Sequence, residues 1–386
     1  MRILQVHTRY RQLGGEDAVV QAERVALGRA GHEVWQHIEA NPTKPAAATA
    51  AFVGSVWNPA AARRIAAVID AVQPDVAHVH NTWFASSPSV LAALRRRGIP
   101  VVMTVHNYRL ACANALLLRD GAPCEKCLDN GPWPAVRHRC YRNSRPASAI
   151  AAAGIAMHSK LDTWARSVDR FIVLNKFASD RLIRAGLPSQ KITLGSNFVE
   201  DPGPRQDAPS QSRDVLFVGR IRAEKGLSVL LDAWRSAPPR GLRLVVIGDG
   251  PDRSPLQSSA PPGVEFLGHR SSEEVMSAML RARALVIPSV WYEMQPVTAL
   301  EGLAAGTPLL LSEIGGLPEL LGGRAAGWVN PPDDPRMLAR ALEPLTDDRA
   351  VDDRGLHARQ RYLEAYTASA AVSRLETVYE SARNGS

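Results

Sequence analysis

The chain has 386 residues, of which 45% are hydrophobic and 22% charged, and its formal net charge is +8 at pH 7. This length predicts two domains, and the composition excludes a chain too polar to bury a core in each of them. The first residues, MRILQVHTRY, lack the basic and long apolar regions of a signal peptide, and the low-charge stretch 147–158 is too short for a membrane span. We therefore expect a cytoplasmic protein.

The positive charge is concentrated in the first half of the chain. Through residue 195 there are 25 basic and 13 acidic residues, whereas the remainder has 21 and 25. This asymmetry indicates an acidic partner for the first half, such as a phosphorylated acceptor, an anionic membrane face or nucleic acid. The alternative is an ordinary solvated surface of an arginine-rich protein.

Apolar runs alternate with helical patterns through the first 198 residues. Strands are expected at 2–7, 32–38, 75–81, 100–107, 170–175 and 191–197. Helices are expected at 16–31, 60–71, 88–97 and 146–168, and between the last two strands. Short strands separated by helices imply βαβ units and a parallel sheet.

The segment 199–213 is rich in Pro, Gly, Ser and Gln and is expected to be an interdomain linker. The alternation then restarts, with strands expected at 214–220, 242–250, 264–269, 284–289 and 308–312. We therefore predict an α/β fold of two doubly wound, Rossmann-like parallel-sheet domains, 1–198 and 214–365, facing across a cleft. Residues 366–386 are expected to form a helix that packs back on the first domain.

The stretch VGRIRAEKG places two cations after an expected strand. The strand ends at Gly219, and Arg220 and Lys225 fall in a strand-to-helix loop that closes with Gly226. Two cations beside a helix N-terminus form a diphosphate site, because the amide dipoles and the full charges both favour an anion there. The alternative is a pair of surface cations near a turn.

The stretch WYEMQPVTALEGLAAGTP, residues 291–308, follows a buried strand pattern. Glu293 is expected in the loop after that strand, Pro296 at the first position of a helix, and Glu301 along its first turns. Carboxylates at these places suit hydrogen bonds from vicinal sugar hydroxyls. A second pair with the same spacing, Glu265 and Glu273, has no such context and is attributed to chance.

A long insert, 108–145, contains all four cysteines in the spacing C-x11-C-x2-C-x12-C. In a cytoplasmic chain this clustering favours a metal over disulfides, and four thiolates would close a structural zinc site. A redox pair, disulfides or inert cysteines remain alternatives. The candidate ligands are Cys112, Cys124, Cys127 and Cys140.

The insert also interleaves arginines with aromatic residues, which predicts an acceptor platform with cations for phosphate and aromatic faces for sugars. The candidates are Tyr108, Arg109, Arg137 and Arg139. The same pattern could stack on single-stranded nucleic acid. No nucleic-acid-binding fold is recognisable, so we expect no nucleic acid partner.

Several stretches together resemble the family 4 retaining glycosyltransferases, which have the GT-B fold. In the second half they are VGRIRAEKG, VIGDGP, FLGHRSSEEV and WYEMQPVTALEGLAAGTPLLLSEIGGLPEL. The first half agrees through GGED, GHEV and TVHN. The resemblance covers nearly the whole chain, and it implies that a sugar is transferred from a UDP- or GDP-sugar to a glycan, lipid-linked or phosphorylated acceptor in cell-surface polysaccharide or glycoconjugate synthesis.

The resemblance also implies roles for single residues. Arg220 and Lys225 resemble the pair that holds the donor diphosphate, Glu301 the residue that binds the ribose, and Glu293 the residue that meets the transferred sugar. His106 resembles the histidine that contacts this sugar from the first domain. The remaining implied donor contacts are Gly14 and Gly15 near the phosphates, Gly268 and His269 near the base, and Met294, Gln295, Pro296 and Val297 at the start of the helix.

One departure concerns the donor. Family members commonly have a Gly-Phe-Gly-like run after the first glutamate, whereas this chain has Met294, Gln295 and Pro296. We therefore expect the amides that meet the sugar and the α-phosphate to be arranged differently. Catalysis would consist largely of stabilising charge on the leaving phosphate. Arg220, Lys225 and a helix dipole can do this without a metal, and the sequence has no Asp-x-Asp motif, so no catalytic cofactor is expected.

Other classes of protein remain open. A sugar-nucleotide epimerase of the same fold would need carboxylates around the anomeric centre, and a phosphorylase would need a pyridoxal-binding lysine. A dinucleotide-dependent oxidoreductase is weakly supported, because GDGPDR has only Gly248 and Gly250 and places Arg253 where a third glycine would stand. A non-catalytic basic binding protein is disfavoured by the set of Arg220, Lys225 and Glu301. With the positive first half, peripheral contact with an anionic membrane is a further expectation.

Overall fold

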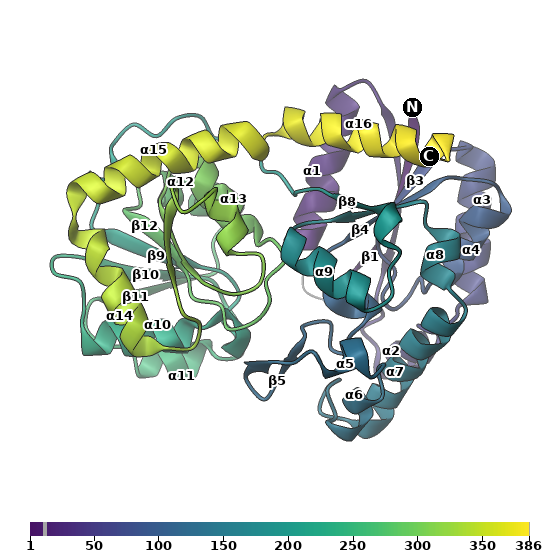
Figure 1. Cartoon of the computed structure of the whole chain (residues 1–386), viewed down its shortest axis with the longest axis horizontal. Helices are drawn as coiled ribbons and strands as arrows, with labels where there is room; N and C mark the ends of the chain where they lie inside the picture. The colour runs from purple at the N-terminus through teal and green to yellow at the C-terminus, as the bar shows by residue number, and fades with distance from the viewer. Residues whose placement is uncertain (11–13, 386) are drawn as a thin grey trace. The chain divides into compact units, whose positions relative to one another are not determined.

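The computed structural model describes residues 1–10 and 14–385, and they form two compact units (Figure 1). The first unit comprises Met1–Leu117, Cys124–Asn197 and Ser369–Ser386, and the second comprises Leu118–Pro123 and Phe198–Ala368. Each unit contains a parallel sheet of six strands with flanking helices. The predicted class, two doubly wound parallel-sheet domains, is therefore confirmed.

The first sheet has the order β2-β1-β3-β4-β7-β8, and the order reverses between β1 and β3. Its strands are β1 (Arg2–Arg9), β2 (Glu33–Ala40), β3 (Val76–Asn81), β4 (Val101–Val105), β7 (Arg170–Val173) and β8 (Ile192–Leu194). In open parallel sheets, ligands bind beyond the carboxyl ends of the strands near such a reversal. The residues after β1, β3 and β4 therefore lie where a ligand is expected.

The helices of the first unit cover both faces of this sheet. They are α1 (Gly15–Arg29), α2 (Pro45–Val53), α3 (Pro59–Val72), α4 (Ser89–Arg96), α7 (Arg145–Lys160), α8 (Thr163–Ser167), α9 (Lys176–Arg184) and α16 (Ala368–Asn384). Although α16 is the last helix of the chain, it runs beside the first elements (Figure 1), and Tyr379 donates or accepts a hydrogen bond at His78 of β3, 2.8 Å away.

In the first unit, one helix prediction was wrong and one helix was missed. The single helix expected over 146–168 is two helices, α7 and α8, because Asp162 adopts a left-handed conformation with φ 49° that interrupts the helix. Helix α2 was not predicted, since its nine residues are mostly alanine and lack an amphipathic period.

The insert after β4 contains short elements of its own. They are a 3-10 turn (Tyr108–Leu110), an antiparallel hairpin of β5 (Leu118–Arg119) and β6 (Ala122–Pro123), α5 (Lys126–Asp129) and α6 (Pro134–Arg137). None of these elements exceeds four residues, so the insert has little regular structure to support it.

The second sheet has the order β11-β10-β9-β12-β13-β14. Its strands are β9 (Asp214–Val218), β10 (Arg243–Ile247), β11 (Val264–Gly268), β12 (Ala284–Ile287), β13 (Leu309–Ser312) and β14 (Gly327–Asn330). The helices are α10 (Leu227–Ser236), α11 (Arg253–Ser258), α12 (Ser272–Leu280), α13 (Val297–Ala304), α14 (Pro335–Leu342) and α15 (Asp348–Ala365). Strand β14 was missed because its sequence, GWVN, is short and has only two apolar residues.

Alternate residues of the second sheet pack into two separate cores. Leu216 and Val245 belong to one core, and Val215 and Leu244 to the other. Because successive side chains of a strand point to opposite faces, this division shows that helices cover both faces of the sheet. The strands are thus held rigidly, and the loops at their carboxyl ends are positioned for a site.

Candidate functional site

The predicted diphosphate loop of the second unit lies between β9 and α10. Arg220 is exposed just after the strand, and Lys225 ends a short 3-10 turn (Ala223–Lys225) directly before the helix. Gly226 has φ +71°, and a Cβ atom there would lie 1.9 Å from the carbonyl oxygen of Pro288. Only glycine fits this position, so the close approach of the two loops fixes Lys225 at the N-terminus of α10.

Lys225 and Glu293, predicted separately, form an ion pair. The Lys225 Nζ lies 2.5 Å from Glu293 Oε1, and Ser289 Oγ donates a hydrogen bond to the same oxygen at 2.9 Å. The Glu293 side chain is only 5% exposed, against 26% for Lys225. The lysine therefore presents its charge to solvent from a fixed position, since a buried carboxylate holds its other side. Ser289 was not predicted as part of this site.

The backbone around Glu293 is held by a glycine pair, Gly315 and Gly316, whose role was not predicted. Gly315 has φ +60°, and a Cβ there would lie 2.7 Å from the carbonyl oxygen of Glu293. Gly316 N donates a hydrogen bond to that oxygen at 2.9 Å. The Gly-Gly pair in LSEIGGLPEL was the sequence signal that could have revealed this support.

Helix α13 carries the second predicted glutamate. Pro296 is the N-cap rather than the first helical residue, Val297 begins the helix, and Glu301 lies one turn further on. Burial raises the pKa of Glu301 to about 7. Near neutral pH, this carboxyl group is about half protonated, so its capacity to accept hydrogen bonds depends on its surroundings. Shifted pKa values of this kind are common in binding sites.

The other predicted donor contacts of the second unit differ in exposure. Gly268 is buried and ends β11, whereas His269 is exposed beside it. Met294 and Gln295 are 3% and 8% exposed. The last two side chains therefore serve mainly to pack the loop after Glu293.

In the first unit, the glycine loop begins α1. Gly14 is the N-cap and Gly15 the first helical residue, while residues 11–13 before them lie outside the described part of the chain. Gly14 N donates a hydrogen bond to Asp17 Oδ2 at 2.9 Å, and the other oxygen of Asp17 lies 3.0 Å from His7 Nε2. His7 and Asp17 thus hold the start of the helix, and neither was predicted.

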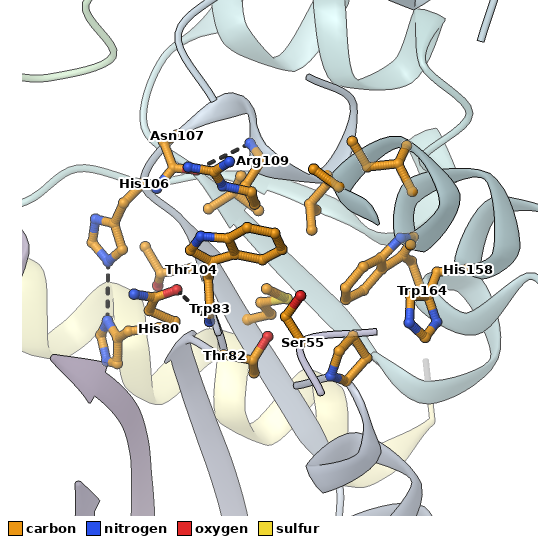
Figure 2. A pocket seen from close by; sticks show the side chains of 18 residues that line it. Ser55, His80, Thr82, Trp83, Thr104, His106, Asn107, Arg109, His158 and Trp164 are labelled. Carbon is orange, nitrogen blue, oxygen red and sulfur yellow. Dashed lines mark hydrogen bonds between the residues drawn. The ribbon is translucent and has the colours of Figure 1, made fainter. Parts of the chain in front are cut away.

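His106 lies directly after β4, as predicted, and its ring contacts that of His80 (Figure 2). Its Nε2 lies 3.1 Å from Nδ1 of His80, and the two rings stack with centroids 5.4 Å apart. Burial first, and then the neighbouring His80, hold the pKa of His106 well below its usual range. The ring is therefore neutral at physiological pH.

A pocket opens beside His106 within the first unit (Figure 2). Trp83 and Trp164 provide aromatic walls, and Arg109 and His158 lie on its lining. The Arg109 guanidinium packs over the Trp83 ring at 4.5 Å and over Tyr141 at 5.6 Å. A cation held on aromatic faces suits a ligand that combines sugar rings with phosphate. The tryptophans were not predicted.

The predicted acceptor residues are not equivalent. Arg109 lines the pocket, but Tyr108 is fully buried and Arg137 and Arg139 are exposed away from the lining. Of the four candidates, the structure therefore brings only Arg109 to the pocket. Tyr108 is a core residue of the 3-10 turn, so its side chain is not available to contact an acceptor.

The four cysteines are present as thiols gathered around Cys127. Burial, and then Cys112, Cys140 and Cys124 as neighbours, raise the pKa of the Cys127 thiol to about 12. Cys127 and Cys140 pack against the same small core of alanines. Among the described residues, however, the groups with three or more ligand atoms within 4.8 Å do not include the cysteines. A tetrahedral site would require the sulfur atoms to draw closer together.

None of the helices in the described part of the chain is long and apolar enough to cross a membrane.

Comparison with known proteins identifies relatives along both halves. Residues 13–201 match the model of Glycosyltransferase Family 4, and residues 212–348 match that of Glycosyl transferases group 1. Glycogen synthase of Mycobacterium tuberculosis is 27% identical over 327 residues, 81% of this chain and 70% of the relative. D-inositol 3-phosphate glycosyltransferase of Corynebacterium aurimucosum is 26% identical over 353 residues, 86% and 76% of the two chains.

Solved structures match over the whole length. Sucrose-phosphate synthase from Thermosynechococcus elongatus aligns over 100% of both chains with a TM-score of 0.74 and 19% identity. The Anabaena protein HepE in complex with UDP aligns over 99% of this chain and 100% of its own, with a TM-score of 0.72 and 14% identity. At these identities the similarity concerns the fold, and it confirms the predicted GT-B class.

Proposed function

The chain belongs to the family 4 glycosyltransferases, and from this premise we propose that it moves a sugar from a UDP- or GDP-sugar to a glycan, lipid-linked or phosphorylated acceptor, with retention of anomeric configuration. Cell-surface polysaccharide or glycoconjugate synthesis is the proposed setting. The observation that carries the proposal is the Lys225–Glu293 pair, fixed at the N-terminus of α10.

Donor binding is assigned to the loops of the second unit. Arg220 and Lys225 would hold the diphosphate, because two cations and a helix N-terminus converge after β9. Glu301 would accept hydrogen bonds from the ribose diol, and Glu293 would meet the transferred sugar. We propose UDP as the first nucleotide to test, since the HepE structure holds it, and the base would lie near Gly268 and His269.

Catalysis is proposed to need no metal ion. The bond between the anomeric carbon and the phosphate oxygen breaks, and the acceptor hydroxyl oxygen bonds to that carbon on the same face. The hydroxyl proton passes to the leaving phosphate, so no protein nucleophile is required. Lys225, Arg220 and the dipole of α10 would stabilise the developing charge, which is the largest contribution expected for such a leaving group.

The acceptor is assigned to the pocket of the first unit. Trp83 and Trp164 offer aromatic faces for sugar rings, and Arg109 offers a cation for phosphate. The excess of basic residues through residue 195 supports an acidic acceptor or peripheral contact with an anionic membrane at its cytoplasmic face. Binding to vesicles with and without anionic lipid at low salt tests the membrane contact, and equal binding to both would contradict it.

The cysteines of the insert are proposed to hold one structural Zn²⁺. Their spacing and their gathering around Cys127 support this, and the short elements of the insert leave it in need of a support. We expect one zinc per chain by elemental analysis, and loss of the metal in Cys124→Ser and Cys127→Ser. Purified wild-type protein without zinc, after growth in zinc-supplemented medium, would overturn this assignment.

A thermal-shift measurement tests the main proposal. A ligand that binds only the folded state raises the unfolding midpoint by mass action. One nucleoside diphosphate should stabilise the wild type selectively, and Glu301→Ala should abolish the shift; the selective nucleotide then identifies the base. Transfer from the matching sugar donor should persist in EDTA. If no nucleotide stabilises the folded protein, an epimerase is excluded as well, and a non-catalytic basic binding protein becomes the better interpretation.

A further inference from the structure

One face of the first sheet carries a run of buried polar side chains. Gln5 and His7 come from β1, His78 and His80 from β3 and Thr104 from β4, and each is 3% exposed or less. Alternate residues of a strand share a face, and the register aligns β1 with β3 so that these side chains are neighbours. Strands buried on both faces are usually almost wholly apolar, so this polar run needs a physical reason.

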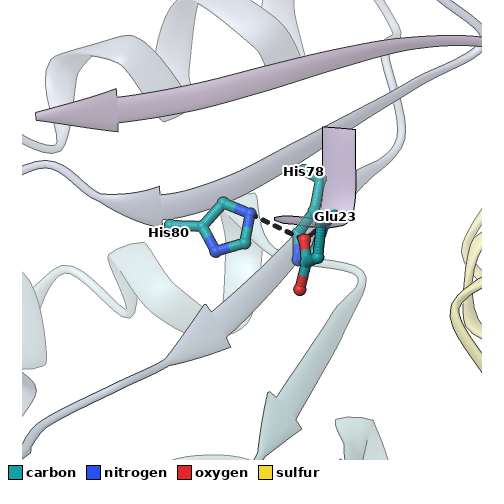
Figure 3. A group of neighbouring side chains, drawn as sticks. All are labelled: Glu23, His78 and His80. Atoms are coloured by element: carbon teal, nitrogen blue, oxygen red, sulfur yellow. Dashed lines mark ion pairs between the residues drawn. The ribbon is translucent and has the colours of Figure 1, made fainter. Parts of the chain in front are cut away.

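Glu23 of α1 reaches into this polar run (Figure 3). Its Oε2 lies 3.2 Å from His80 Nε2 and 3.4 Å from His78 Nδ1, and Glu23 is 5% exposed. Gln5 donates a hydrogen bond to the same oxygen at 3.5 Å. The contact has an ion-pair distance but not the geometry of a hydrogen bond, and His80 Nε2 has no other hydrogen-bond partner among the described residues. Because the carboxylate is negatively charged and can only accept, it favours the ring proton of His80 on the nitrogen that faces it.

A metal ion is an alternative explanation of this group, because ligand atoms of Glu23, His78 and His80 lie within 4.8 Å of one another. His78, however, already uses both ring nitrogens. Its Nδ1 lies 2.8 Å from the Tyr379 hydroxyl and its Nε2 lies 2.7 Å from the Thr104 hydroxyl. These hydrogen bonds account for His78 without an ion, and a metal would have to displace one of them.

The proton on His80 decides the state of the next histidine. In the neutral form of His80 with its proton on Nε2, Nδ1 is a lone pair, and His106 Nε2 then donates across the 3.1 Å between them (Figure 2). His106 then has its own proton on Nε2 and a lone pair on Nδ1. The chain of contacts from Glu23 thus selects one of the two neutral tautomers of His106.

We propose that Glu23 and His80 are positioning residues that hold His106 with its proton on Nε2, so that Nδ1 accepts a hydrogen bond from a hydroxyl of the donor sugar. This rests on the proposed function, together with the contact between His106 and the donor sugar that the family resemblance implies. The arrangement is physically useful because the acceptor atom is fixed before the donor arrives, and no proton has to move on binding. Outer partners that fix the tautomer of a ligand-binding histidine act in the same way at metal sites.

The variant Glu23→Gln tests the proposal. The amide keeps the size of the side chain but can donate as well as accept, so both tautomers of His80 and His106 become possible. The readout is the ¹⁵N spectrum of histidine-labelled protein, with His106 assigned by its loss in His106→Asn. His158 serves as an internal control, because its Nε2 lies 2.8 Å from the carbonyl oxygen of Val56, which fixes its tautomer independently of Glu23.

In the wild type we expect His106 with Nε2 protonated and Nδ1 unprotonated between pH 6 and 8. In Glu23→Gln we expect a mixture of tautomers at His106, an unchanged His158, and a fall of about tenfold in kcat/KM for the sugar donor. The affinity for the nucleoside diphosphate alone should stay within about twofold, because the cations proposed to hold it, Arg220 and Lys225, lie in the second unit.

Two results would overturn the proposal: a wild-type His106 protonated on Nδ1, or a tautomer in Glu23→Gln identical to that of the wild type. The wild-type spectrum needs no variant, so it decides even if Glu23→Gln fails to fold, which the loss of the His158 pattern would reveal. If the tautomers behave as expected but no sugar donor is consumed, the positioning of His106 stands and the proposed function fails.

Discussion

The two units position their functional side chains by different means. In the second unit, Lys225 and Glu293 stand in loops whose backbones are set by glycines, and each lies within a contiguous stretch of sequence. In the first unit, His106 depends on His80 and Glu23, which come from another strand and from a helix. Local turns are visible in a sequence as motifs, whereas a site assembled through strand register is not.

The largest effect is expected from Lys225→Ala, which removes the charge proposed to face the leaving diphosphate. It also leaves the nearly buried Glu293 without its ion-pair partner. We expect a fall of about 100- to 1000-fold in kcat, the size found when a preorganised charge or donor is removed from a transition state. Steady-state kinetics check it.

The matched control for that variant is Arg222→Ala, an exposed cation in the same loop whose ion pair with Glu224 is 3.9 Å long. It should change kcat by less than about twofold, since exposed ion pairs contribute little. If Lys225→Ala loses less than tenfold, the lysine serves the fold rather than the reaction.

The next effect concerns the glycine that places this lysine. In Gly226→Ala the new Cβ would collide with the Pro288 carbonyl at φ +71°, whereas Gly241→Ala has a similar φ, +77°, and no atom within 4 Å. We expect the free energy of unfolding to fall by about 3 kcal/mol in the first and about 1 kcal/mol in the second. Urea titration followed by tryptophan fluorescence measures both, and equal losses would show that the close approach is unimportant.

This contrast also explains what the sequence could predict. The alternating strands and helices, the two doubly wound domains and the loops around Lys225 and Glu293 follow from local periodicity and turn chemistry. The ion pair between these two residues could not be predicted, because 68 positions separate them and no pattern links them. Likewise, Glu23 looks like any acidic residue of an amphipathic helix until the fold buries it.

The insert also shows that a sequence pattern does not predict how its side chains are placed in the fold. Its cysteine spacing suggested a metal site, but the structure gathers the thiols around Cys127 without bringing them to ligand distance as a set. The aromatic walls of the pocket, Trp83 and Trp164, come from segments on either side of the insert. A prediction built on the composition of the insert alone therefore chose Arg137 and Arg139, which lie elsewhere.

A smaller effect is expected in the pH dependence of nucleotide binding. Burial raises the pKa of Glu301 to about 7, so the group is largely protonated at pH 6 and ionised at pH 8. The ionised form accepts two hydrogen bonds from a ribose diol, and we therefore expect affinity for the nucleoside diphosphate to rise by about tenfold between these values. The same raised pKa means that ionisation opposes folding, so the contribution of Glu301 to stability falls as pH rises from about 4.5 to 7.

Isothermal titration calorimetry at several pH values checks the binding prediction. The diphosphate itself titrates in part of this range, and Glu301→Gln, which cannot ionise, removes only the contribution of the protein. If the affinity of Glu301→Gln changes with pH as much as that of the wild type, the pH dependence belongs to the nucleotide. That result would contradict a role for Glu301.

The smallest effect is expected at the acceptor pocket, where no full charge is lost. Trp83→Ala removes an aromatic wall and the ring under the Arg109 guanidinium, 4.5 Å away. A cation held over an aromatic face and one sugar-stacking surface together contribute about 1 kcal/mol, so the KM for the acceptor should rise about fivefold while the KM for the donor stays unchanged. Trp35→Ala, at a tryptophan that is 48% exposed on β2, is the control and should alter neither. A change confined to the donor KM would place the donor sugar, rather than the acceptor, in this pocket. The assignment of acceptor binding to the first unit and donor binding to the second would then be wrong.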